Sequence, residues 1–200
     1  MAWIETISPQ NATGKLAELY EQIKTPDGHI DNVLTIHSLR PRTLAAHLAL
    51  YKAAIHSRPN DLSPRERELV GTVVSALNGC HYCKEHHQAG LTRHLDNDSA
   101  LADELVQAAT GNVASESLTA REKALSLYAT KLTRSPEEMV EEDILPLREH
   151  GLSEAGILDL NQIVAYFAYV NRMVLGLGVD IHGEPLGLHP SEDEEGFRHS

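Results

Sequence analysis

The sequence predicts an all-α fold. Ala, Leu and Glu, which favour helices, are abundant, whereas alternating runs of β-branched residues are scarce. Three segments begin with Leu-Ser or Leu-Thr, at Leu62, Leu118 and Leu152, and each is followed by apolar residues at helical spacing. With 200 residues and 42% hydrophobic content, the chain can form one domain with a sizeable core or two small lobes packed together.

The N-terminal third predicts three helices, each with its apolar side chains on one face. We expect them at residues 13–24, 32–39 and 41–57. Pro41 suits the first turn of the third helix, where a missing backbone N–H costs nothing. The turn signals that begin at Pro26 and Pro59 end the first and third helices.

The clearest helix start in the chain is at Ser63. Ser63 is a good N-cap, Pro64 fits the first helical position, and Glu66 completes a capping box. The helix that follows should be interrupted at Gly79 and its neighbour Asn78, because glycine weakens a helix interior. A second helix should then run from near Cys80 to about residue 93.

The C-terminal half predicts further helices and a tail. We expect the helices at residues 100–109, 120–132, 136–150 and 153–175. The start at Leu118-Thr119 repeats the pattern at Leu62-Ser63, with Glu again three residues past the cap, which hints at a duplicated helical unit. We expect residues 1–180 to form a single domain and the acidic tail, 181–200, to be extended or disordered.

The composition excludes some classes of partner. A formal charge of −12 argues against nucleic acid and anionic membranes, since phosphate binding needs clustered Lys and Arg. No apolar run approaches the length of a membrane span. The first residues lack the basic and apolar regions of a signal peptide, so we expect a cytoplasmic protein. In that compartment a close cysteine pair is typical of redox or metal chemistry rather than of a structural disulfide.

The two cysteines of the chain, Cys80 and Cys83, lie in its most informative stretch. On a helix, Cys83 shares a face with Cys80 three residues before it and with His87 four residues after it. His81 and His86 point elsewhere. If Gly79 breaks the helix, Cys80 lies near a helix N-terminus, where the partial positive charge favours the thiolate.

Glu68 joins this group if the chain folds back at Gly79. Glu68 precedes the turn by about as many residues as His87 follows it, at depths of roughly 15 and 12 Å along two helices. A helical hairpin therefore pairs the carboxylate with the imidazole. The carboxylate would orient His87 towards Cys83, which is the relay logic of nucleophile, base and orienting group.

Three other interpretations stay open at this point. Glu68 could face solvent beside Glu66 and Arg67. Cys80, Cys83 and His87, with a nearby His or Glu, supply enough ligands for zinc, although no second ligand pair stands at the usual spacing. The two thiols could also pack as small apolar side chains without chemistry.

One known family has a core motif that resembles this stretch, namely Glu68, eleven residues, Cys80-x-Tyr82-Cys83, three residues, His87. It is the alkyl hydroperoxidase D (AhpD) and carboxymuconolactone decarboxylase superfamily. The match covers about residues 62–94, and the flanking helices look like the full-length branch of peroxidase-related proteins. The resemblance implies an AhpD-like helical bundle of roughly eight to ten helices with a central helical hairpin.

The resemblance also implies a function. It suggests a thiol-dependent peroxidase, with Cys83 as the peroxidatic thiolate, Cys80 as the resolving thiol, and His87 with Glu68 as the proton relay. The expected partners are a peroxide, an external dithiol reductant such as a lipoyl or thioredoxin-like protein, and further copies of the chain in a trimer or hexamer. No cofactor and no metal ligands are expected. The alternatives are a zinc-binding or redox-sensing module and a decarboxylase-like enzyme that uses Glu68 and His87.

Overall fold

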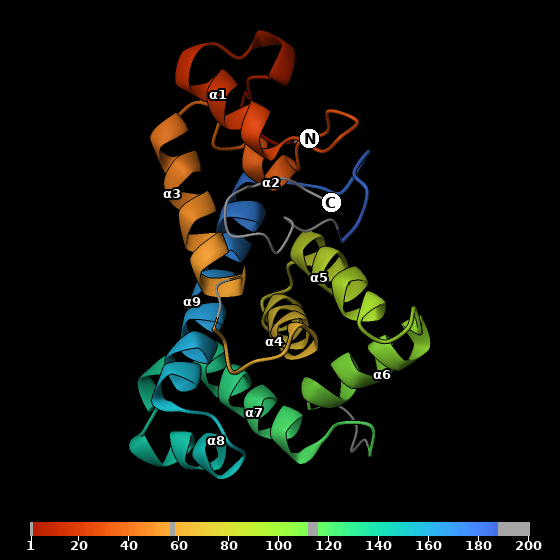
Figure 1. The fold of residues 1–200 in the computed structure, drawn as a ribbon, viewed down its shortest axis with the longest axis vertical. Coiled ribbons are helices and arrows are strands. Elements are labelled where there is room, and N and C mark those ends of the chain that lie inside the picture. The colour runs from red at the N-terminus through yellow and green to blue at the C-terminus, as the bar shows by residue number, and fades with distance from the viewer. Residues whose placement is uncertain (1, 57–58, 112–115, 188–200) are drawn as a thin grey trace.

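The computed structural model describes residues 2–56, 59–111 and 116–187, and within them the regular structure is entirely helical (Figure 1). The all-α prediction is therefore confirmed. Short 3₁₀ helices span Pro9–Asn11, Pro136–Glu138 and Glu141–Ile144, and a π-helix spans Lys52–His56. The α-helices are α1 (Gly14–Ile23), α2 (Asn32–Thr35), α3 (Pro41–Tyr51), α4 (Pro64–Leu77), α5 (His81–Arg93), α6 (Ser99–Ala109), α7 (Ala120–Arg134), α8 (Leu145–Glu149) and α9 (Glu154–Leu177).

Helix α4 lies at the centre of the molecule, with α5, α7 and α9 packed around it (Figure 1). Its apolar residues cover more than one face, and Leu69, Val70, Val73 and Val74 are all fully buried. A helix that is apolar on several faces is stable only when neighbours cover each of them. This position explains why a polar side chain on α4 must find a partner inside the protein.

The predicted break between α4 and α5 is present. Gly79 has φ = 69°, a left-handed conformation that glycine adopts without the penalty of a Cβ atom. The N–H of Cys80 donates to the carbonyl of Ser75 at 2.9 Å, which closes the end of α4. The chain then reverses, and Cys80 becomes the N-cap residue of α5. The predicted central helical hairpin is thus confirmed.

The repeated helix starts form a reciprocal connection between α4 and α7. Both predicted capping boxes are present, from Ser63 with Glu66 and from Thr119 with Glu122. Each of these buried carboxylates also accepts a hydrogen bond from the arginine of the other helix. Arg65 Nε lies 2.8 Å from Glu122 Oε1, and Arg121 Nε lies 2.6 Å from Glu66 Oε1. One local signal therefore caps two helices and fixes their N-termini to each other.

Some predicted helices differ from the structure. The segment 136–150 is not one helix, because extended residues at Met139 and Val140 separate two 3₁₀ helices before α8. Helix α2 ends at Thr35, short of the predicted residue 39, in a series of turns before Pro41. The residue before a proline is disfavoured in the helical conformation, which explains why a new helix starts there.

The chain end after α9 returns across the molecule. Gly178, with φ = 63°, ends α9, and the following segment runs past α2 and α5 (Figure 1). Within it, the Glu184 side chain is fully buried. The rest of the predicted tail, 188–200, lies outside the described residues. Among the described helices none is both long and apolar enough to cross a membrane.

Candidate active site

The structure brings the sequence-predicted Glu68 and His87 into direct contact. Glu68 Oε2 lies 2.8 Å from Nδ1 of His87, between α4 and α5. Glu68 is only 4% exposed, so its interpretation as a solvent-facing residue is wrong. The contact occupies Nδ1, and proton exchange with another group therefore falls to Nε2 of the imidazole.

The His87 ring is also held by an aromatic contact. Phe167 of α9 meets it edge to face, with ring centroids 4.6 Å apart and planes at 89°. The end of the Phe167 ring lies directly over Gly71 of α4, where a Cβ atom would overlap it. Gly71 thus makes room for Phe167, and Phe167 packs against the imidazole.

Cys80 and Cys83 form a buried pair at the start of α5, and both are free thiols. A hydrogen bond with Cys83 lowers the pKa of Cys80 below its ordinary value. The same bond, together with burial, raises the pKa of Cys83 well above its ordinary value. Of the two thiols, Cys80 is therefore the one that loses its proton at lower pH.

Asn171 of α9 lies beside the cysteines, although the sequence indicated for it only a possible place in the lining of a pocket. It is fully buried, and its side chain hydrogen-bonds to both cysteines. This bond favours the thiolate of each cysteine, but at Cys83 the bond with Cys80 and burial outweigh it and the pKa stays raised. Its Nδ2 also donates to Ser75 Oγ at 3.2 Å, and its Oδ1 accepts from Asn78 Nδ2 at 2.9 Å. These bonds fix the amide orientation. A buried Asn on an apolar helix was the only available signal.

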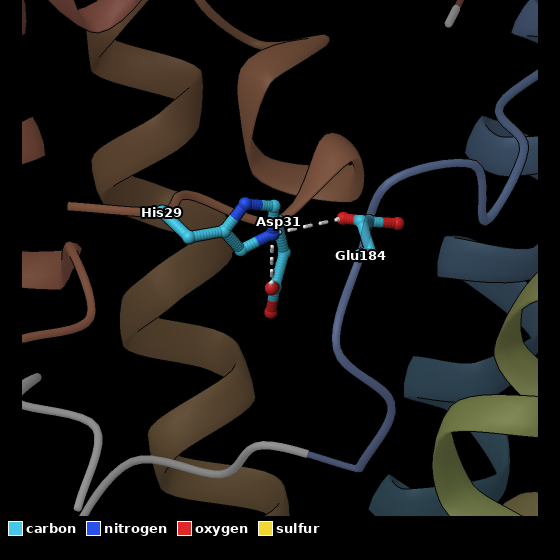
Figure 2. Close-up of side chains that lie close together, drawn as sticks. All are labelled: His29, Asp31 and Glu184. Carbon is cyan, nitrogen blue, oxygen red and sulfur yellow. Dashed lines mark ion pairs between the residues drawn. The ribbon is translucent and has the colours of Figure 1, made fainter. Parts of the chain in front are cut away.

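The other face of α5 leads to a second polar group. Tyr82, between the two cysteines, stacks on His86 with ring centroids 4.6 Å apart, and its hydroxyl donates to Glu184 Oε1 at 3.0 Å. Glu184 lies beside His29 and Asp31, whose side chains converge with it in Figure 2. Sequence reasoning missed this group because its members are separated by up to 155 residues, from position 29 to position 184.

Metal-ligating atoms gather at this second group and not at the cysteines. Among the described residues, only His29, Asp31 and Glu184 bring three such atoms within 4.8 Å of one another. Cys80, Cys83 and His87 do not form a group of this kind in the same part of the chain. The arrangement at the cysteines thus favours thiol and proton chemistry.

The comparisons with known proteins identify a family that matches the part of the chain with α4 and α5. Residues 41–130 match the carboxymuconolactone decarboxylase family, a range that includes all of α4 and α5. The solved AhpD core of an uncharacterized peroxidase-related protein from Ralstonia eutropha JMP134 superposes with a TM-score of 0.77 at 25% identity, over 90% of this chain and 91% of that one. These matches support the assignment of the chain to the alkylhydroperoxidase D and carboxymuconolactone decarboxylase superfamily.

Two further solved structures have the same fold. An uncharacterized peroxidase-related protein from Silicibacter sp. TM1040 has a TM-score of 0.72 at 27% identity, over 89% of this chain and 87% of that one. The debrominase Bmp8 has a TM-score of 0.71 at 18% identity, over 89% and 91%. No curated protein sequence matches the chain. Superfamily membership supports a peroxidase-related or decarboxylase-like enzyme.

Proposed function

We propose that this protein is a thiol-dependent peroxidase that reduces a hydroperoxide through a Cys80–Cys83 disulfide cycle. The proposal is supported by a hydrogen-bonded cysteine pair and His87 on one helix, α5, with Glu68 bonded to Nδ1 of the imidazole. Because His87 is one turn after Cys83 on this helix, the nucleophile, the base and the orienting carboxylate would follow one another, as covalent catalysis requires.

The reaction begins with the loss of the Cys83 proton. The raised pKa of Cys83 means that its thiol needs a base, and His87, one turn further along α5, is the side chain that would accept the proton. Glu68 would then stabilise the imidazolium through Nδ1. The burial of both partners strengthens this interaction relative to the same pair in water.

The Cys83 thiolate then attacks one oxygen of the O–O bond. The bond breaks, Cys83 becomes sulfenic acid, and the alkoxide leaves as an alcohol after taking the proton from His87. Attack by the Cys80 sulfur on the sulfenic acid forms the Cys80–Cys83 disulfide and releases water. Two electrons have passed from the two thiols to the peroxide. An external dithiol, itself oxidised to a disulfide, restores the pair.

We further propose a lipoyl or thioredoxin-like protein as that dithiol, and a trimer or hexamer as the assembly. Both proposals rest on the resemblance to the superfamily.

The proposal is tested by thiol titration before and after one equivalent of a hydroperoxide. We expect both thiols of each chain to be lost without a crosslink between chains. Cys83→Ser should retain its remaining thiol, whereas Cys80→Ser should accumulate a sulfenic acid that a dimedone probe traps. Glu85→Gln, on the exposed side of α5, is the matched control and should behave like the wild type.

Three outcomes would contradict the proposal. If both thiols survive the peroxide, the disulfide cycle is wrong. If Cys83→Ser forms the sulfenic acid on Cys80, the order of the two cysteines is reversed. Turnover of an organic acid by a Cys80→Ser/Cys83→Ser variant would instead support the decarboxylase-like alternative, in which Glu68 and His87 act without the thiols.

A further inference from the structure

Three segments that are distant in the sequence converge on one side of α5. His29 and Asp31 come from the loop between α1 and α2, Glu184 comes from the segment after α9, and His86 comes from α5 itself. In Figure 2 the imidazole of His29 points between the two carboxylates, with dashed lines to both. Its Nε2 lies 3.5 Å from Asp31 Oδ1 and 3.7 Å from Glu184 Oε1.

The atoms that face one another here have no hydrogen-bond partner among the described residues. They are His29 Nε2, Asp31 Oδ1, Glu184 Oε2 and His86 Nε2, and each is inaccessible to solvent. Buried polar atoms are almost always satisfied, because leaving one unpaired costs stability. Unpaired ligand atoms at His29 and Asp31, and again between His86 and Glu184, therefore point to a missing partner beside the Glu184 carboxylate.

The sign of that partner follows from the charges. Two carboxylates are buried close together, and in the described part of the chain no Lys or Arg lies within ion-pair distance of either one. The other oxygen of Glu184 is already held by the Tyr82 hydroxyl and the backbone N–H of Asn32. The carboxylate is thus oriented, with Oε2 left for a positively charged group.

The separations fit an ion shared by His29, Asp31 and Glu184, with His86 next to the other oxygen of Glu184. Two ligands at about 2.1 Å from a tetrahedral ion are about 3.4 Å apart. The recorded separations are 3.5 and 3.7 Å around His29 Nε2 and 3.7 Å between His86 Nε2 and Glu184 Oε2. All three ligand atoms of His29, Asp31 and Glu184 lie within 4.8 Å of one another, so small side-chain movements would close the set.

We propose that His29, Asp31 and Glu184, with His86 as a fourth ligand, bind a divalent first-row transition-metal cation. A mixture of imidazole and carboxylate donors suits zinc, manganese or iron, whereas calcium and magnesium prefer sites made of oxygen alone. The ion neutralises the buried carboxylates. It also joins the chain segment after α9 to α5 and to the start of α2, independently of which reaction the cysteines perform.

The site adjoins the cysteine motif through Tyr82. This residue separates Cys80 from Cys83, and its hydroxyl donates to Glu184 on the side away from His87. The backbone N–H of Val33 donates to the same hydroxyl at 3.3 Å. Binding of the ion would therefore fix Tyr82, a positioning residue, through the ligand Glu184.

The proposal is tested with zinc on the full chain. Protein stripped with a chelator is titrated with Zn²⁺ against a chromophoric competitor, in a Cys80→Ser/Cys83→Ser background so that thiols contribute no ligands. We expect one ion per chain. Loss of a mere outer-shell partner lowers metal affinity by about 10–100-fold, so Asp31→Asn and Glu184→Gln should each lower it by about 100-fold or more.

Matched controls come from the same chain end. His182 and Asp180 form an exposed pair 3.0 Å apart, and His182→Gln should keep full zinc affinity. A His189→Gln/His199→Gln variant removes the remaining histidines of the C-terminal tail and should also bind normally. Circular dichroism establishes that each variant is folded before its affinity is compared.

A second measurement tests the site without any substitution of its ligands, in case those variants do not fold. In the cysteine-free background with Co²⁺, the site should give visible d–d bands typical of nitrogen and oxygen ligands. If the cysteine-free protein binds neither Zn²⁺ nor Co²⁺, the proposal is overturned. Protonated imidazoles would then balance the buried carboxylates. The proposal would also be overturned if folded Asp31→Asn and Glu184→Gln variants bound zinc as tightly as the cysteine-free background does.

Discussion

Helices α4 and α7 start from the same sequence pattern and end in different roles. Each has a Ser or Thr cap, an Arg two residues later and a Glu one residue after that, and the two ends are joined by reciprocal ion pairs. Two positions beyond the capping Glu, α4 has Glu68 and α7 has Ala124, and both are buried. The difference at this single position separates the helix with chemistry from the helix that supports it.

The environments explain why the two positions tolerate different residues. Glu68 faces α5, where His87 offers a polar partner at 2.8 Å, whereas Ala124 lies among apolar side chains of the core. A buried carboxylate is tolerated only where a donor is fixed opposite to it. The comparison teaches that a shared local signal builds equivalent helices, and that the neighbouring helix decides which of them can carry a charge.

The largest effect is expected when the charge is moved to the supporting helix. Ala124→Glu would bury a carboxylate in the apolar core and should lower the free energy of unfolding by about 3–5 kcal/mol. Leu127→Glu places the same residue on the exposed side of α7 and should change it by no more than about 0.5 kcal/mol. Urea denaturation measures both, and similar values for the two variants would contradict the comparison.

Removal of the charge from α4 should affect chemistry more than stability. Glu68→Gln keeps the shape of the side chain but no longer stabilises a protonated His87, so thiol oxidation by peroxide should slow by about 100-fold, equivalent to about 2.7 kcal/mol. Stopped-flow measurement of disulfide formation across a pH range tests this. An unchanged rate would show that Glu68 is a structural partner only.

Gly71 gives a third contrast between the helices. The corresponding position of α7 is the exposed Leu127, whereas Gly71 lies against the buried ring of Phe167. Gly71→Ala should therefore destabilise the protein by about 1–3 kcal/mol and slow thiol oxidation, because Phe167 packs on His87. Gly176→Ala, in α9 with open space around it, should instead stabilise by about 0.4–1 kcal/mol. Thermal denaturation shows whether the two changes have opposite signs.

The shared part of the pattern should matter to both helices alike. Glu122→Ala removes a capping box and the ion pair with Arg65, so it should lower the free energy of unfolding by about 1–2 kcal/mol. Thiol oxidation should be unaffected, because Glu122 touches none of the residues of the site. A slowed reaction in folded Glu122→Ala would show that the two helix starts are not independent of the chemistry.

The smallest expected effect is a shift in the pH at which Cys80 ionises, since it concerns only the cysteine pair and its hydrogen bonds. The hydrogen bond from Cys83 and that from Asn171 lower the pKa of Cys80, so its thiolate forms at lower pH than that of an ordinary cysteine. Cys83→Ala should move this titration to higher pH, and Cys83→Ser should move it less, because a hydroxyl still donates. Asn171→Leu should also move it up, whereas Asn161→Leu, elsewhere on α9, should not. Iodoacetamide alkylation against pH gives each midpoint.

Local patterns predicted a large part of the fold and of the candidate site. The caps at Ser63 and Thr119, the turn at Gly79 and the contact between Glu68 and His87 all depend on short stretches of chain, where helical geometry restricts the outcome. The prediction of one helix over residues 136–150 was wrong, because it relied on a local signal at the start of the segment alone. The Ser135-Pro136-Glu137-Glu138 start favoured a helix, but the backbone at Met139 and Val140 is extended, which a start signal does not reveal.

The sequence by itself determined the helical class, the hairpin and the contact between Glu68 and His87. Only the tertiary structure decided that Asn171 reaches the two thiols and that Glu184 lies beside His29 and Asp31. These contacts join residues about 90 to 155 positions apart, and their geometry is set by how helices pack rather than by the period of any one helix. Helical spacing brings together residues within one or two turns, and packing of the whole core is needed for the rest.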